Sequence, residues 1–156
     1  MKRLKADQFA DQWALLTAGQ KEHFNMMTIS WGGMGTLWNK PVVTVYVKPC
    51  RYTYEFMEKN DYFVVSFFGG THKEDLNILG THSGRHEDKL SLTSLTPIEI
   101  NHGMTYQEAI QTIICKKIYE QDLNLNQIPV EAMNGYYRNE LVHRMFIGEI
   151  IEIIEK

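Results

Sequence analysis

Hydrophobic and β-branched residues recur along the chain in short runs, whose length and alternation are typical of β-strands rather than helices. A polar stretch, Gly19–His23, separates the first two runs and has the length of a turn between neighbouring antiparallel strands. The pattern therefore predicts a sheet that begins with a hairpin. The predicted strands are Trp13–Ala18, Phe24–Trp31, Val42–Val47, Tyr62–Phe68, Thr112–Tyr119 and Arg144–Ile154.

Helical signals are fewer and shorter. Thr53 is placed to cap a helix over Tyr54–Lys59, and Lys73–Leu79 forms a second candidate that Gly80 closes. Thr105 and the residues after it resemble the capping-box start of a third helix. Strands joined by short helices, without strict βαβ alternation, favour a mainly β fold: an antiparallel barrel with a few short peripheral helices.

The segment 123–139 breaks the strand pattern. It contains Pro129 and the turn pair Asn134–Gly135, and it shows little periodicity. We expect it to form an excursion that covers one side of the barrel or a partner subunit.

Composition places the chain among ordinary globular proteins. Its 156 residues are 44% hydrophobic and 22% charged, which predicts one domain over residues 1–156. The formal net charge of −3 disfavours binding to nucleic acid or to an anionic membrane surface. Cys50 and Cys115 lack the spacing of a disulfide scaffold or zinc site. The charged N-terminus has no apolar signal region, and no window is apolar enough to span a membrane, so we expect a cytoplasmic protein.

One predicted strand runs into a glycine-rich turn, Gly32–Gly35. Alternation puts Met26, Thr28 and Ser30 on one face of that strand and Met27, Ile29 and Trp31 on the other. The glycines do not form a dinucleotide fingerprint, because the third glycine and a following helix are both missing. From periodicity alone, a half-buried strand with a solvated polar face is the favoured interpretation, because periodicity does not identify a ligand.

Two further segments carry anion-binding chemistry. In Lys48–Thr53, Arg51 leads into the helix that Thr53 is expected to cap, and a helix N-terminus offers free N–H groups to a phosphate. In Gly80–Lys89, hydroxyls and cations gather in a glycine-containing loop. The alternatives are an ordinary capped helix and a solvated polar loop.

The histidines give weaker signals. His82 and His86 have the spacing of a helical metal pair, but Gly84 lies between them and no further ligand completes a set, so we predict no metal site. His143, just before the last predicted strand, is either a proton donor or a polar residue at a strand end.

Taken together, these segments resemble the flavin reductase-like family of FMN-binding split barrels, and within it the flavoredoxin-type branch. The resemblance runs in family order over residues 13–154. It is carried by Asn25–Trp31, Trp38 with Lys40–Pro41, Arg51–Thr53, Phe63–Phe67, Ser83–Arg85 with Asp88–Lys89, and His143 with Met145–Ile150.

The resemblance implies a six-stranded antiparallel Greek-key split barrel, active as a homodimer with one FMN per subunit near the interface. It implies that NADH or NADPH donates hydride to the flavin without a dinucleotide-binding domain. By the same resemblance, Met27, Thr28, Ile29, Ser30 and Trp31 would line the isoalloxazine, and Arg51, Tyr52, Thr53, Ser83 and Lys89 would surround the phosphate.

Three functions fit this resemblance. The first is a flavin reductase that passes electrons to free flavin, a ferric complex or a redox protein partner. The second is a non-enzymatic FMN electron carrier that a protein partner reduces. The third is a barrel that has lost its flavin and acts as a binding module.

Overall fold

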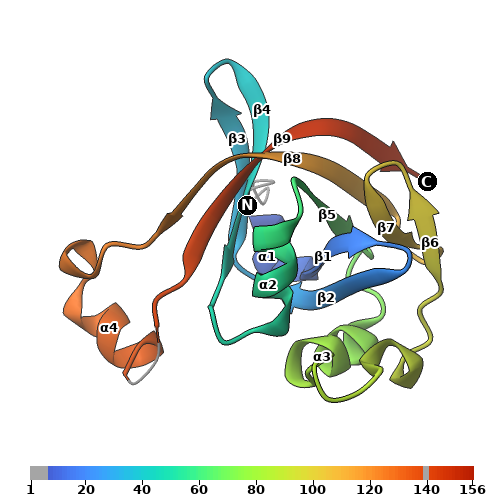
Figure 1. The fold of residues 1–156 in the computed structure, drawn as a ribbon, viewed down its shortest axis with the longest axis horizontal. Helices are drawn as coiled ribbons and strands as arrows, with labels where there is room; N and C mark the ends of the chain where they lie inside the picture. Colours follow the sequence, from blue (N-terminus) through green and yellow to red (C-terminus); the bar gives the residue numbers. More distant parts are fainter. Residues whose placement is uncertain (1–6, 139–140) are drawn as a thin grey trace.

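Seven antiparallel strands form the main sheet, in the order β2-β1-β5-β8-β9-β4-β3 (Figure 1). The computed structural model describes residues 7–138 and 141–156. The strands are β1 (Ala14–Gln20), β2 (His23–Ile29), β3 (Gly32–Leu37), β4 (Lys40–Val47), β5 (Tyr62–Phe67), β8 (Gln111–Asp122) and β9 (Arg144–Glu155). A separate hairpin pairs β6 (Pro97–Ile100) with β7 (Gly103–Tyr106).

The two edge strands of the main sheet, β2 and β3, follow one another in the chain. Only Ser30 and Trp31 lie between them, so the last residue of β2 and the first of β3 are at most about 11 Å apart. The sheet must therefore curl until its edges approach each other at this link. The predicted mainly β, antiparallel split barrel with short peripheral helices is confirmed.

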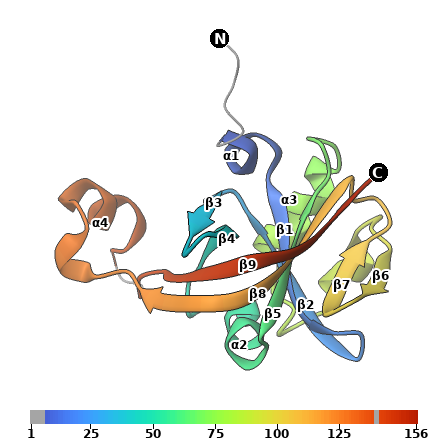
Figure 2. The same ribbon diagram turned by 90° about the horizontal axis from the view of Figure 1, so that it is seen from above.

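Short helices lie around the sheet (Figure 2). They are α1 (Gln8–Gln12), α2 (Tyr52–Lys59), α3 (Lys73–Thr81) and α4 (Val130–Tyr136), with 3-10 turns η2 (Lys89–Leu92) and η3 (Leu125–Gln127). Helix α2 contacts β1 and β2, and α3 contacts β2. Among the described residues, no helix is both long enough and apolar enough to cross a lipid bilayer.

Alternation along β2 divides its side chains between two cores. Met27 and Ile29 are buried with residues of β1, β4, β5 and α2, whereas Met26 is buried with Leu76 and Leu79 of α3. The predicted opposition of Met26 to Met27 and Ile29 is therefore confirmed. This division leaves β2 packed on both faces, which fixes its register against β1.

Two sequence expectations about the strands are wrong. The sheet has one strand more than predicted, because Gly32–Leu37 forms β3 rather than a turn. The turn lies at Trp38 and Asn39, which adopt positive φ angles of 51° and 58° and so reverse the chain into β4. Edge strand β3 tolerates its glycines, since their positions are half-buried or exposed.

The third predicted helix is also absent, because Thr105 lies in β7. Its hydroxyl is buried and pairs with the hydroxyls of Thr112 at 2.6 Å and Ser66 at 3.1 Å. The next residue, Tyr106, is buried as well, with its hydroxyl 3.0 Å from that of Thr17. This buried hydroxyl network binds the small hairpin to the barrel and overrides the capping-box pattern.

Residues 123–138, which we call the arm, project from the barrel at the end of β8 (Figures 1 and 2). Neither η3 nor α4 contains a buried residue. The expectation that this segment covers one side of its own barrel is therefore wrong, and packing on a partner subunit stays a prediction. Residue 139 of that prediction and residues 1–6 of the charged N-terminus lie outside the described residues.

Candidate functional site

A groove opens where the chain crosses from β2 to β3. It has a volume of about 270 Å³. We call it the strand groove; it is lined by Met27, Thr28, Ile29, Ser30, Trp31, Tyr46, Lys48, Arg51 and His143. All five strand residues singled out from the sequence therefore lie in one cavity. Ser30 and Trp31 lie outside the strand ladders, so their backbone groups are placed to meet a ligand.

A second, more polar cavity of about 250 Å³ adjoins the first, and Arg51 lines both. We call it the cation pocket. It is lined by Asn25, Cys50, Arg51, Tyr52, Thr53, Gly80, Thr81, His82, Ser83, Gly84 and Lys89. The structure thus brings together Arg51, Tyr52, Thr53, Ser83 and Lys89, the five residues that the resemblance assigned to one pocket.

The end of helix α3 holds the two cations of this pocket. Arg51 donates through Nη2 to the carbonyl of Gly80 at 3.0 Å. Lys89 is only 3% exposed and donates through Nζ to the carbonyls of Leu79 at 2.9 Å and His82 at 3.2 Å. The last carbonyls of a helix carry partial negative charge, which favours cations at this end.

Burial makes both cations electrostatically costly. It lowers the pKa of Arg51. Burial, and to a lesser extent the positive charge of Arg51, lowers the pKa of Lys89 to about 8. Within the described part of the chain, neither side chain forms an ion pair with a carboxylate. Two neighbouring cations without a counter-charge are the arrangement that an anionic ligand stabilises.

The donor capacity of the pocket also fits a phosphate group. Lys89 has three N–H donors and uses two of them on carbonyls, and the Arg51 fork uses one of its five. The remaining donors can meet phosphate oxygens without releasing α3. Helix α2 begins at the same pocket with Tyr52 and Thr53, and its first N–H groups have no side-chain cap.

Thr53 has a different role from the predicted helix cap. Helix α2 starts at Tyr52, with Arg51 at the N-cap position, and the Thr53 side chain is buried. Its Oγ1 accepts a hydrogen bond from Asn25 Nδ2 at 2.9 Å, which ties α2 to β2. Gly84 approaches the same asparagine so closely that an added Cβ would lie 2.2 Å from Asn25 Oδ1. Asn25 therefore bonds to the helix and packs closely against the loop that form the pocket.

The predicted polar loop Gly80–Lys89 is partly helical, since α3 continues through Thr81. Ser83 Oγ accepts from the backbone N–H of Arg85 at 3.2 Å, which shapes the turn at the pocket wall. The ring of His82 contacts Glu87 at 2.6 Å. Among residues 7–138 and 141–156, no group of three or more metal-ligating side chains lies close together.

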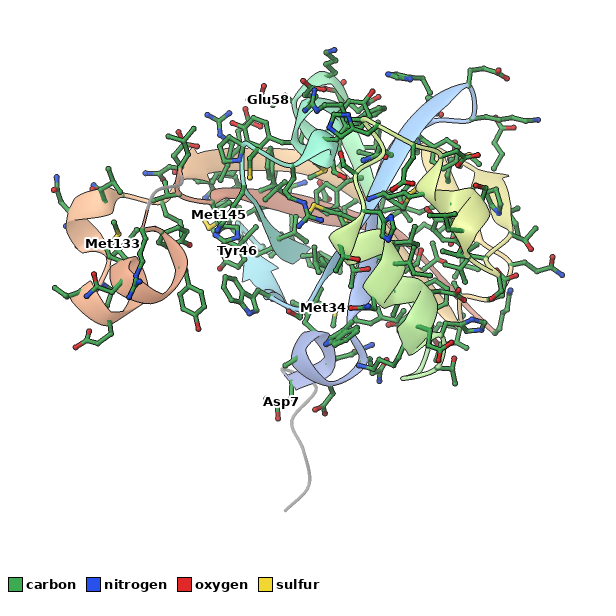
Figure 3. All side chains as sticks on the ribbon, turned by 90° about the horizontal axis from the view of Figure 1, so that it is seen from below. Asp7, Met34, Tyr46, Glu58, Met133 and Met145 are labelled. Atoms are coloured by element: carbon green, nitrogen blue, oxygen red, sulfur yellow. The ribbon has the colours of Figure 1, made fainter. Side chains whose placement is uncertain are left out.

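A third cavity, of about 520 Å³, adjoins the strand groove on the side of the arm. We call it the aromatic pocket. It shares Ser30, Trp31, Tyr46 and His143 with the groove, and Figure 3 shows Tyr46 on the sheet between the arm and α1. The other lining residues are Asp7, Phe9, Ala10, Gly32, Leu123 and Tyr137.

The arm reaches this pocket through Tyr137. Its hydroxyl lies 2.6 Å from Nδ1 of His143, the candidate proton donor of the sequence analysis. Burial raises the pKa of Tyr137, so its hydroxyl stays protonated at neutral pH. The Trp31 ring lies 5.3 Å from the His143 ring and 4.9 Å from the Tyr136 ring, measured between centroids. His143 therefore lies where the groove, the pocket and the arm meet.

The sequence analysis missed Tyr46, Tyr137 and Asn25 as site residues. A signal existed for Tyr46, because it interrupts the aliphatic residues of its strand and faces away from buried Val45 and Val47. Tyr137 had none, since the fold of the arm places it. Asn25 was quoted in the resemblance without a role.

Comparison with known proteins identifies relatives of this arrangement. Residues 6–156 match the family model described as "Flavin reductase like domain". A search of curated protein sequences found no match. Solved structures share the fold at low identity. Flavoredoxin from Methanosarcina acetivorans has 24% identity and a TM-score of 0.68, covering 93% of this chain and 68% of the other.

Two further structures extend this comparison. Flavoredoxin of Desulfovibrio vulgaris (Miyazaki F) has 21% identity and a TM-score of 0.73 over 100% of this chain and 77% of the other. The NADH:FAD oxidoreductase of Streptomyces globisporus, solved with NAD and FAD fragments, has 15% identity and a TM-score of 0.70 over 94% and 75%. On the family match over almost its whole length, the chain belongs to the flavin reductase-like domain family.

Proposed function

We propose that the chain is an FMN-binding flavin reductase that uses NADH or NADPH as hydride donor. The observation that carries the proposal is the pair of buried cations, Arg51 and Lys89, at one end of a groove lined by the β2–β3 link. A phosphate bearing about two negative charges would compensate both cations. The similar proteins with flavin-related names support a flavin as the bearer of that phosphate.

In this proposal, each cavity has its own role. Arg51, Lys89 and Ser83 hold the phosphate, together with the first N–H groups of α2 at Tyr52 and Thr53. The strand groove receives the isoalloxazine, and residues 27–31 line it. The FMN, when bound, supplies the redox chemistry by taking up hydride and releasing electrons to an acceptor. The protein fixes the ring system and limits its contact with water.

An anaerobic titration tests the proposal. FMN is added to the purified chain, its binding is followed by absorbance and flavin fluorescence, and NADH or NADPH is then added. Binding followed by loss of the flavin absorbance supports the reductase. Binding without reduction by either nucleotide would instead favour the electron carrier, a function that the likeness to two flavoredoxins makes relevant.

Riboflavin, which lacks the phosphate, separates the roles of the two cavities. Lys89→Met should weaken binding of FMN by about tenfold or more and leave riboflavin affinity unchanged. Lys21→Met is the matched control, because that lysine is exposed and pairs with Glu99 outside the site. Equal affinity of the wild-type protein for FMN and riboflavin would contradict the proposal that the cation pocket binds the phosphate.

We further propose that this single FMN-binding domain, residues 1–156, acts as a cytoplasmic homodimer. Support for the dimer comes from β9, where Ile151 and Ile153 are about half exposed, at 46% and 51%, although they lie in a paired strand. The free Cys50 and Cys115 agree with a reducing compartment. Light scattering of the wild-type protein and of Ile153→Lys tests the dimer; a monomeric wild-type protein would refute it.

A further inference from the structure

The aromatic pocket differs chemically from the cation pocket. Five rings line it, from Phe9, Trp31, Tyr46, Tyr137 and His143, and they favour a flat ligand that stacks. Its volume of about 520 Å³ falls within the range of small-molecule sites. Among the described lining residues there is no lysine or arginine, and Asp7 adds a negative charge at one side. The pocket therefore favours a neutral ligand over a phosphate or an anionic ferric complex.

The aromatic pocket also contains polar groups that can hydrogen-bond a substituent on the ring of a flat ligand. The hydroxyl of Tyr137, 2.6 Å from His143 Nδ1, lies among the rings together with Ser30 and Tyr46. Tyr137 itself is only 8% exposed. A buried hydroxyl beside an imidazole is suited to hydrogen-bond a carbonyl oxygen and to pass it a proton. The ligand should therefore carry a carbonyl oxygen on its ring.

An apolar groove continues from this pocket along the arm. It also has a volume of about 520 Å³ and shares Trp31, Leu123 and Tyr137 with the aromatic pocket. We call it the arm groove; further lining comes from Ile128, Pro129 and Ala132. Its described lining has no charged side chain. A ligand with its ring in the aromatic pocket can therefore extend an aliphatic substituent along the arm.

We propose that the aromatic pocket and the arm groove bind a neutral quinone with an aliphatic side chain, and that this quinone is the electron acceptor. The binding of the quinone is argued from the two cavities alone. Its role as electron acceptor rests on the proposed function. The acceptor site adjoins the strand groove, because Ser30, Trp31, Tyr46 and His143 line both.

The reaction balances without a further reactant. NADH or NADPH gives up a hydride and becomes the oxidised nucleotide, while the quinone gains two electrons and two protons and becomes a hydroquinone. One of these protons comes with the hydride, and solvent supplies the other through the His143–Tyr137 pair. Both ring carbonyls are thereby converted to hydroxyls.

Binding to the FMN-free protein tests the quinone site. Equilibrium dialysis compares tetramethylbenzoquinone with its analogue in which a decyl chain replaces one methyl; full substitution keeps both from adding to thiols. The wild-type protein should bind the decyl compound at least about tenfold more tightly, since burial of even two CH₂ groups accounts for that factor. Ile128→Asp should abolish this preference. Val130→Asp is the control, because Val130 lies on the arm, is 71% exposed and does not line the groove.

Reduction by the FMN-loaded protein tests the role of the quinone as electron acceptor. Tyr137→Phe should lower the turnover of the decyl quinone by about 100-fold, the lower end for general acid catalysis, with FMN affinity unchanged. Tyr119→Phe, whose hydroxyl contacts Gln121 on β8, should leave turnover unchanged. Rapid reduction of ferric complexes without reduction of either quinone overturns the acceptor assignment.

The outcomes separate this inference from the proposed function. Equal binding of the two quinones, or a decyl preference that survives Ile128→Asp, overturns the quinone site even if FMN binds and is reduced. A protein that binds the decyl quinone with the expected preference but takes up no FMN supports the quinone site and refutes the flavin reductase.

Discussion

The two ends of the site are built in opposite ways. At the cation pocket, the functional side chains are buried and held by backbone carbonyls of a helix that packs on the barrel. At the aromatic pocket, Trp31 is 44% exposed, and the arm beside it contains almost no buried residue apart from Tyr137. The comparison teaches that the cation pocket is built from buried, hydrogen-bonded side chains, whereas the aromatic pocket adjoins a weakly packed segment.

The largest effect is expected from removing both cations. Arg51→Ala combined with Lys89→Met should weaken FMN binding by at least about 100-fold, because each charge-assisted contact contributes roughly 1.5 to 3 kcal/mol. Titration of flavin fluorescence measures the change. A thermal melt checks that the variant still folds, because the loss of two buried charges is offset by the carbonyls of α3 that lose their donors. FMN affinity that stays within about threefold of wild type would place the phosphate elsewhere.

A smaller effect follows from moving the loop that closes the cation pocket. Gly84→Val should lower the free energy of unfolding by about 1 to 3 kcal/mol, because the new side chain clashes with Asn25. It should also lower FMN affinity by about tenfold. Gly35→Val is the matched control, since an added Cβ there meets no atom within 4 Å. Thermal melts and FMN titrations of both variants decide the point. Similar behaviour of the two variants would contradict the role of Asn25.

The dependence of FMN affinity on pH should reveal the protonation of Lys89. Its pKa is about 8 in the free protein, and a bound phosphate raises it, so FMN binds with uptake of a proton above pH 8. Affinity should be highest below pH 8 and fall by up to about tenfold between pH 7 and pH 9. Riboflavin, or the Lys89→Met variant with FMN, should give a flat profile. A flat profile for wild-type FMN binding would show that Lys89 does not face the phosphate.

The smallest effect is expected at the aromatic end. Trp31→Ala should weaken FMN and riboflavin by the same factor of about two to ten, because ring stacking contributes roughly 0.5 to 1.5 kcal/mol and does not involve the phosphate. Trp38→Ala, in the turn between β3 and β4, is the control, because Trp38 is 61% exposed and lies outside the groove. A loss confined to FMN would show that the two ends of the site are not independent.

The sequence predicted the parts of this protein that local chemistry decides. Six of the seven strands of the main sheet, β2 included, followed from β-branched and aromatic runs, because such runs pack well on a half-buried sheet. The strand β3 was missed, since its glycines are typical of turns and its pairing with β4 depends on the reversal at Trp38 and Asn39. Thr105 was misassigned because its buried hydroxyl partners, Thr112 and Ser66, are not visible locally.

The candidate site divides in the same way. Residues 27–31 share the strand groove, and Arg51 lies at its junction with the cation pocket, because short motifs fix their own surroundings. That these residues bind a flavin stays a prediction. The partners of Lys89 were not predictable, since the loop after α3 must turn back before η2, which begins with Lys89, contacts the end of the helix. The direction of the arm was the hardest feature to predict, because no periodic pattern shows which way a projecting segment extends from the barrel.

The carbonyls at the end of α3 have a consequence for the rate of ligand exchange. Because the oxygens of Leu79, Gly80 and His82 already orient both cations, an arriving phosphate meets donors that need no search among rotamers. In the proposed complex, little side-chain entropy would then be lost on binding of the phosphate. Differences in FMN affinity among variants would then appear mainly in the dissociation rate. The rate constant of flavin dissociation would then decide whether the flavin is a tightly bound cofactor or a dissociable substrate. Contacts outside the cation pocket would set that rate constant.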